Sequence, residues 1–163
     1  MRVETTRFGV LDVDESSVIK MPKGPMGFES LTEFVVIEHR PDTEFRWMQS
    51  TEDPALAFVV VDPAKFFNEY EIEISDADVE KLHLTSETDA TVLVIVTIAD
   101  SGKDITANLA APVIINSKEL IAQQIVVQDS RFGVKHQLIA YIDKPAEEKL
   151  SPERVEGTTV KAA

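Results

Sequence analysis

Residues 45–63, FRWMQSTEDPALAFVVVDP, carry the clearest strand pattern of this chain. The side chains of its first half alternate with a period of two, which is typical of a β-strand. The Asp53-Pro54 step breaks this pattern, because the residue before a proline is pushed out of the helical region. Residues 56–61 are almost wholly apolar, as in a strand covered on both faces. The segment therefore predicts a β-hairpin that ends at Asp62-Pro63, with Phe45, Trp47 and Gln49 on one face of its first strand and Arg46, Met48 and Ser50 on the other.

The remainder of the chain contains further short strand-like runs and one helix-like segment. Residues 75–84 have the helical pattern, because Ser75 can cap the N-terminus and Val79 and Leu82 lie three apart on one face. A parallel sheet would need more crossover helices than the pattern offers. We therefore predict a mainly β, single-domain antiparallel barrel or roll of about ten short strands with one short helix. The other strand-like runs lie within 2–20, 31–39, 92–98, 106–109, 112–115, 123–127 and 135–142.

The end of the chain differs in composition. From residue 144 on it has two prolines, mixed charge and no aromatic residue. Such a segment cannot bury enough apolar surface to offset its ordering entropy. We predict a β domain over residues 1–142 and a disordered tail over 143–163. The alternative is a tail that folds on a partner, with Leu150 and Val155 as anchors.

The charge balance restricts the partners. The chain has 163 residues, with 29 acidic against 16 basic, and a net charge of −13. This charge repels nucleic acid and attracts a basic protein, although acidity also serves solubility alone. Without cysteine there is no disulfide and no thiolate nucleophile. No apolar run reaches the roughly 20 residues of a membrane helix, and the start MRVETTRFG lacks the apolar core of a signal peptide. We expect a cytoplasmic monomer that binds neither nucleic acid nor membranes.

Few residues suggest catalysis or metal binding. Asp53 and Asp62 bracket the apolar strand, but an Asp before Pro commonly caps a turn. A glycosidase-like carboxylate pair is the alternative. Asn108 and Asn116 are interpreted as structural residues that satisfy backbone groups. We predict no enzyme activity and no cofactor, because the sequence shows no catalytic set of residues. We also predict no metal, because the three histidines lack metal-ligand spacing: His39, His83 and His136.

An aromatic and acidic segment is the best candidate for a binding surface. Phe66, Phe67 and Tyr70 either pack on the core or face a partner. Residues 69–89 then carry eight acidic side chains and one basic one. Aromatic anchors beside a charged rim are typical of protein interfaces, whereas the alternative is a solvated helix face. The candidate partner-binding residues are Phe66, Glu69, Tyr70, Glu71, Glu73, Asp76 and Asp78.

Five segments, in order over residues 3–138, resemble a known family. Residues 21–28, MPKGPMGF, are similar to an FPxGxPGF-like motif, from which Met21 and Met26 depart. Residues 106–116, TANLAAPVIIN, resemble TANLxAPxxIN, and 124–136, QIVVQDSRFGVKH, resemble a closing strand with its final His. Together with the hairpin and 66–71, FFNEYE, they resemble the bacterial flagellar assembly factor FliW family.

The resemblance implies a regulatory binding protein with two alternative partners. Family members hold flagellin in the cytoplasm. When free of flagellin, they bind and antagonise the basic translational repressor CsrA, which relieves repression of flagellin synthesis. Two alternatives stay open: an export chaperone for flagellin alone, or an enzyme with a pocket in a β-barrel that uses Asp53, Asp62 and His136.

Overall fold

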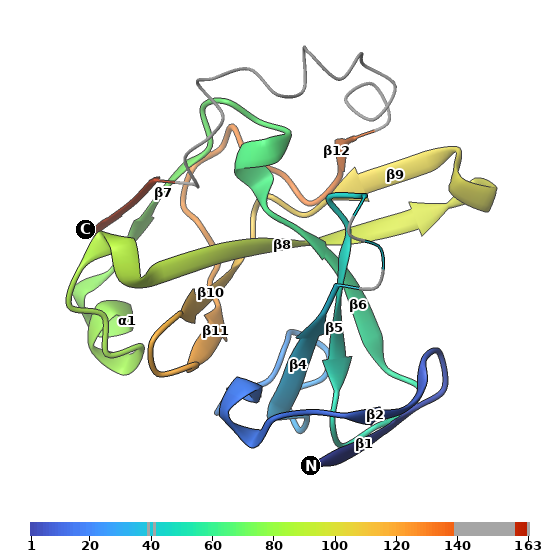
Figure 1. Ribbon diagram of the computed structural model, residues 1–163. Coiled ribbons are helices and arrows are strands. Elements are labelled where there is room, and N and C mark those ends of the chain that lie inside the picture. Colours follow the sequence, from blue (N-terminus) through green and yellow to red (C-terminus); the bar gives the residue numbers. More distant parts are fainter. Residues whose placement is uncertain (39, 41, 139–158, 163) are drawn as a thin grey trace.

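A computed structural model describes residues 1–38, 40, 42–138 and 159–162 of the chain (Figure 1). Its main feature is a curled nine-stranded sheet with antiparallel strand pairing, in the order β11-β10-β8-β6-β5-β4-β3, to which β9 and β12 add beside the second half of β8. The strands are β3 (Ile19–Lys20), β4 (Glu33–Ile37), β5 (Arg46–Ser50), β6 (Ala57–Val61), β8 (Ala90–Ala99), β9 (Asp104–Ala107), β10 (Val113–Asn116), β11 (Ala122–Gln124) and β12 (His136–Gln137). The predicted mainly β, antiparallel architecture with one short α-helix is confirmed.

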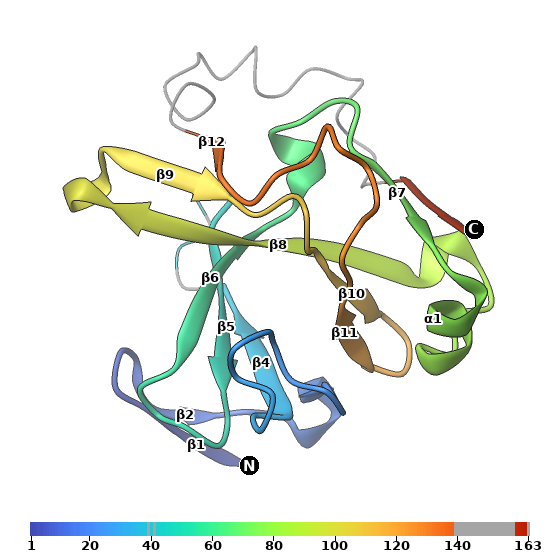
Figure 2. The same cartoon turned by 180° about the vertical axis from the view of Figure 1, so that it is seen from behind.

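The smaller elements lie around this sheet. β1 (Arg2–Thr5) and β2 (Gly9–Asp12) form a hairpin, and β7 (Glu71–Ile74) pairs in parallel with β13 (Thr159–Ala162). Both views place β7 and the helix α1 (Asp76–Lys81) at the opposite end of β8 from the β8–β9 turn (Figure 2). Short 3-10 turns occupy η1 (Glu15–Ser17), η2 (Pro63–Lys65), η3 (Glu87–Asp89) and η4 (Asp100–Gly102).

The predicted hairpin is present as β5 and β6, and it is covered on both faces. Val61 belongs to one cluster of buried side chains, together with Leu82 and Leu109. Its neighbour Val60 belongs to a second cluster, with Phe34 and Met48. The Gln49 side chain closes the turn, because its Nε2 donates to the carbonyl oxygens of Ser50 and Leu56, both at 3.0 Å. Because successive side chains of β6 point to opposite faces, this one strand contributes to both buried clusters.

The helix is shorter than predicted. Ser75 caps it as expected, since its Oγ accepts the backbone N–H of Asp78 at 3.1 Å. The helix ends at Lys81 rather than at residue 84, because Leu82 is its C-cap and His83 has a positive φ of 56°. A left-handed residue cannot continue a right-handed helix. Leu82 is buried and Val79 half-buried, which confirms the predicted apolar stripe.

Two further elements differ from the sequence expectation. The described residues contain thirteen strands rather than about ten, and β7 was not among those predicted. The predicted boundary at residues 142 and 143 lies outside the described residues. Residues 159–162, within the predicted tail, are described as strand β13.

The 21–28 motif forms a loop in which a glycine is required. A Cβ built on Gly24 would lie well under 3.0 Å from the carbonyl oxygens of Leu31 and Phe28. Those oxygens are backbone atoms and cannot move aside as a side chain can. Gly27 has a φ of +88°, which L-residues rarely adopt. The backbone N–H of Met26 then donates to Gln124 Oε1 at 2.9 Å, which ties the loop to the end of β11.

Candidate partner-binding surface

Strand β7 is divided between the core and the surface. Ile72 is 3% exposed and Ile74 is fully buried, whereas Glu71 and Glu73 are exposed. Because successive side chains of a strand point to opposite faces, the two glutamates share the outer face. Glu69 precedes them and is exposed as well. The apolar half of the strand therefore fixes the position of its carboxylates.

Helix α1 continues the acidic surface directly after β7. Asp76 is exposed in its first turn, and Asp78 is half-buried. The Asp78 carboxylate accepts a hydrogen bond of 3.4 Å from Gln123 Nε2, which holds it toward β11. Both carboxylates also lie at the positive end of the helix. The structure thus brings together the five acidic residues that the sequence selected as partner-binding candidates.

Three of these residues line a groove of about 620 Å³, which we call the acidic groove. β7 and the start of α1 form one wall, and residues 125–131 form the other. Glu71, Glu73 and Asp78 line the first wall. Asp129 and Arg131 line the second and form an ion pair at 2.7 Å. The described lining residues thus carry four carboxylates and one guanidinium.

The electrostatics of the second wall follow from that ion pair. The Arg131 side chain, with a further hydrogen bond from its backbone N–H, holds the pKa of Asp129 below its ordinary value. Asp129 in turn raises the pKa of Arg131, and Glu69 and Glu71 add to the effect. Asp129 on the second wall and Glu71 on the first wall therefore both stabilise the charged guanidinium. A cation from another molecule would meet a groove whose described lining is net negative.

The aromatic candidates lie in the core and not on the surface. Phe66 is 4% exposed and Tyr70 is 3% exposed. The Tyr70 hydroxyl donates to the carbonyl oxygen of Leu109 at 2.6 Å, and its ring meets Phe132 edge to face at 4.6 Å. Burial raises the pKa of this hydroxyl. The interpretation of Phe66 and Tyr70 as exposed anchors is corrected, because both rings belong to the buried cluster that also contains Ile72 and Ile74 of β7.

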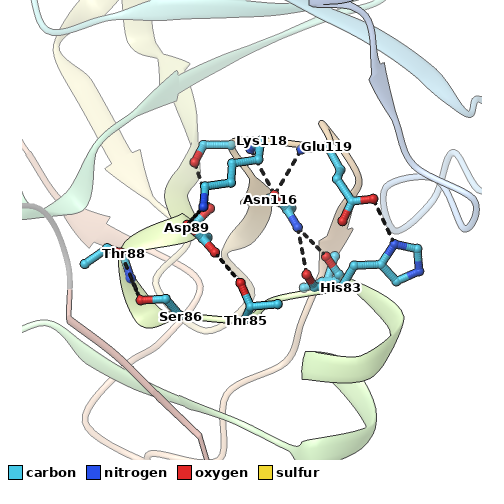
Figure 3. A network of polar contacts seen from close by, with 10 residues as sticks. His83, Thr85, Ser86, Thr88, Asp89, Asn116, Lys118 and Glu119 are labelled. Carbon is cyan, nitrogen blue, oxygen red and sulfur yellow. Dashed lines mark hydrogen bonds and ion pairs between the residues drawn. The ribbon is translucent and has the colours of Figure 1, made fainter.

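A polar network holds the far end of α1 (Figure 3). Asn116 is 2% exposed, and its Nδ2 donates to the carbonyl oxygens of Leu82 at 2.8 Å and His83 at 3.2 Å. Its Oδ1 accepts the backbone N–H groups of Lys118 at 2.9 Å and Glu119 at 3.1 Å. The predicted structural role of Asn116 is confirmed. One amide therefore joins the end of the helix to the β10–β11 turn.

Asp89, the last residue of η3, anchors the same network directly before β8. It is 5% exposed and accepts a hydrogen bond from the Thr85 hydroxyl at 2.9 Å. Lys118 Nζ lies 3.2 Å from its carboxylate. These two contacts, Thr85 first, lower the pKa of Asp89. The loop between α1 and β8 is thus fixed by an ionised carboxylate.

The other candidates from the sequence take structural positions. Asp53 Oδ1 accepts the N–H of Ala55 at 3.0 Å, and Asp62 Oδ1 accepts that of Ala64 at 2.9 Å, which confirms both as turn caps. Asn108 Oδ1 accepts from the N–H groups of Ala110 and Ala111, as predicted. Histidine contacts are local: His83 Nδ1 lies 3.4 Å from Glu119, and His136 Nε2 accepts from the N–H of Gly133, whereas His39 is outside the described residues.

No group of three or more His, Cys, Asp or Glu side chains in the described ranges could hold a metal ion. Over the same ranges, no helix has the length and apolar character needed to cross a membrane.

One feature of the site was missed from the sequence: the wall of residues 125–131. Its approach to β7 joins segments about fifty residues apart, and no local pattern signals it.

A curled antiparallel sheet with an acidic groove beside a buried aromatic support has the features of a small protein-binding domain. The FliW protein family model matches residues 2–138. The flagellar assembly factor FliW of Leptospira biflexa is 36% identical over 91% of this chain and 97% of its own. That of Geobacter sulfurreducens is 37% identical over the full length of both chains. A crystal structure of the flagellar assembly factor FliW superposes with a TM-score of 0.78 at 33% identity, over 85% of this chain and 96% of the other. The chain belongs to the FliW family.

Proposed function

We propose that this chain is a flagellar assembly factor that binds flagellin in the cytoplasm and, when free of it, binds the translational repressor CsrA. Binding of CsrA would relieve repression of flagellin synthesis. Family membership supports the flagellar role, since the relatives are named flagellar assembly factors, a non-catalytic role. The observation that carries the CsrA half is the acidic groove, because CsrA is basic.

The switch between the two partners follows mass action. Each partner that binds the folded chain reduces the concentration of free chain available to the other. Abundant flagellin then leaves CsrA unbound, and export of flagellin releases the chain to bind CsrA. No covalent step is required. The chain itself would act as a monomer.

The acidic groove supplies attraction and orientation. A net charge of −13 produces a field that steers a basic partner toward the molecule. The carboxylates of β7 and α1 then concentrate negative potential at one end of β8. Ion pairs of this kind raise association rates more than they raise affinity.

The arrangement of the carboxylates favours docking beside the RNA site of CsrA over imitation of RNA. Glu71 and Glu73 lie on a strand, Asp78 on a helix and Asp129 on a separate segment. They do not follow one another in a row with the spacing of phosphates along a single strand. Enough RNA would displace a pure mimic completely. A stable ternary complex of this chain, CsrA and RNA, detected by size exclusion, is the outcome we expect.

The surface is tested with a double charge reversal, Glu71→Lys and Glu73→Lys. Each reversal adds two positive charges, so the net charge changes from −13 to −9. We expect the association rate with CsrA to fall about tenfold at low salt, with a weaker salt dependence. Stopped-flow mixing measures the rate, and circular dichroism checks that the fold is unchanged.

The matched control reverses Glu4 and Glu15, which are exposed in β1 and η1. This variant has the same net charge but an intact acidic groove. We expect its association rate to stay within about twofold of the unmodified chain. Equal losses in both variants would assign the effect to net charge, and no loss in the first would place the CsrA contact elsewhere.

Flagellin binding is tested separately. Size exclusion with light scattering is applied to mixtures of this chain, CsrA and flagellin. We expect a complex with either partner alone and displacement of CsrA as flagellin is added. Recovery of a flagellin complex only would support an export chaperone that never contacts the regulator.

A further inference from the structure

A second groove lies far from the acidic one. It has a volume of about 420 Å³ and is lined by residues of the β1–β2 turn, the segment before β5, and strands β5, β6 and β8. We call it the Trp47 groove, after the single tryptophan of the chain. The acidic groove adjoins the helix end of β8, whereas Ile98 of the Trp47 groove lies near its other end. The two grooves share no described lining residue.

The floor of the Trp47 groove is an uncovered extension of the core. Trp47 pairs with Val59 across β5 and β6, and Val59 pairs with Val96 across β6 and β8. Paired residues of antiparallel strands point to the same face, as do residues two apart in a strand. Ile98 therefore continues the row beyond Val96. Val96 is 5% exposed, but Ile98 is 49% exposed.

The rim of the groove is cationic. The Arg7 guanidinium lies 4.3 Å from the centre of the Trp47 ring, and the Phe8 ring meets Trp47 edge to face at 5.6 Å. Arg40 lines the same groove. Neither arginine forms an ion pair with another described residue, and no described carboxylate lines the groove. The chain has 29 acidic and 16 basic residues, so this groove differs from the molecule as a whole: its described charged residues are two arginines.

We propose that the Trp47 groove docks an amphipathic helix of a partner protein. Apolar side chains of that helix cover Trp47 and Ile98, and its carboxylates pair with Arg7 and Arg40. The charge of the rim selects an acidic helix. A helix fits better than an added strand, because β5 and β6 are each paired on both sides and offer no free edge. This surface shares no described lining residue with the acidic groove, so the CsrA contact proposed above does not depend on it.

The test uses Trp47 as its own reporter. Two synthetic helical peptides share one leucine stripe, with glutamates on both flanks in the first and lysines in the second. Each is titrated into the full chain at 0.15 M salt, where the screening length of about 8 Å leaves local pairing and suppresses the net charge. We expect a saturable blue shift of the Trp47 fluorescence, with the glutamate peptide binding at least about tenfold more tightly.

Variants distinguish binding at the groove from nonspecific hydrophobic association. Ile98→Asp should abolish the fluorescence shift, and Arg7→Glu with Arg40→Glu should reverse the preference between the peptides. Val134→Asp is the matched control, because Val134 is 61% exposed and lies outside both grooves. It should bind as the unmodified chain does. The result is independent of CsrA, so its failure would leave the acidic groove untouched.

Three outcomes would overturn the assignment. Equal binding of the two peptides, or tighter binding of the lysine peptide, would exclude an acidic partner. No saturable shift with either peptide would exclude helix docking. Sedimentation tests whether the chain alone dimerises as its concentration rises. Dimerisation that is lost in Ile98→Asp would assign the groove to a second copy of the chain instead.

Discussion

Replacing Asn116 with alanine should destabilise the chain, because this side chain joins the end of α1 to the β10–β11 turn. The side chain makes four hydrogen bonds of 2.8 to 3.2 Å. A net contribution of about 1 kcal/mol each gives an upper figure of about 4 kcal/mol. The Lys118 and Glu119 N–H groups belong to exposed residues, so water replaces part of their loss. The carbonyl of buried Leu82 has no such replacement, and we expect a loss of about 3 kcal/mol.

Urea unfolding measures this free energy, and thermal unfolding checks it. For a chain of this size, 3 kcal/mol corresponds to a fall in Tm of roughly 9 °C. Asn108→Ala is the matched control, because Asn108 Oδ1 accepts only from Ala110 and Ala111, at 3.1 and 3.2 Å. That variant should lose about 1 to 2 kcal/mol. If Asn116→Ala lost no more than the control, the network would be a consequence of the fold and not a support for it.

Asn116→Asp tests the direction of the hydrogen bonds. The aspartate keeps an oxygen for the N–H groups of Lys118 and Glu119. Its second oxygen, when ionised, faces the carbonyl oxygens of Leu82 and His83, which repel it. We expect a loss at neutral pH at least as large as that of alanine. Stability should partly recover as the pH falls and the carboxyl protonates, since a protonated oxygen can donate. A loss that is independent of pH would contradict the assigned orientation of the amide.

Three further predictions concern other named contacts. Tyr70→Phe removes the hydroxyl that donates to Leu109 and should cost about 1 kcal/mol by urea unfolding, with the buried ring unchanged. Gly24→Ala should cost more than Gly102→Ala, because a Cβ at Gly24 meets backbone oxygens, whereas Gly102 has only its φ of +88° to maintain and should cost about 1 kcal/mol. The lowered pKa of Asp89 stabilises the folded state fully above its ordinary value of 3.8, and this contribution disappears as the pH falls through the lower folded-state value. Urea midpoints should therefore fall less steeply below pH 3.8 in Asp89→Asn.

Local patterns predicted the parts of the fold that depend on neighbouring residues. The hairpin of β5 and β6 was predicted because its alternation, its Asp-Pro turn and its apolar strand lie within nineteen residues. The Ser75 cap and the apolar stripe of α1 were predicted for the same reason. The end of the helix was not, because His83, whose φ is positive, contacts Asn116 and Glu119, which lie 33 and 36 residues further along the chain.

The errors concern residues whose neighbours in space are distant in sequence. Glu71 to Ile74 alternate strictly, but four residues are too few to distinguish a strand from an exposed acidic segment without the core that buries Ile72 and Ile74. The position of Tyr70 depends on a carbonyl 39 residues away, so an aromatic beside an acidic run can equally face outward or inward. The second wall of the acidic groove has the same origin. No window of sequence shows that residues 125–131 approach β7.

The alternation of β7 separates binding from folding. Ile72 and Ile74 secure the strand in the core, while Glu71 and Glu73 face the groove and add little to that packing. Charge reversal at the two glutamates therefore leaves the burial of Ile72 and Ile74, which holds the strand in the core, unchanged. The Trp47 groove has no such separation, because its floor residues Trp47 and Val59 also belong to central strands. A partner that docks there is recognised by residues the fold itself requires, so binding specificity at that groove is set by its rim, Arg7 and Arg40.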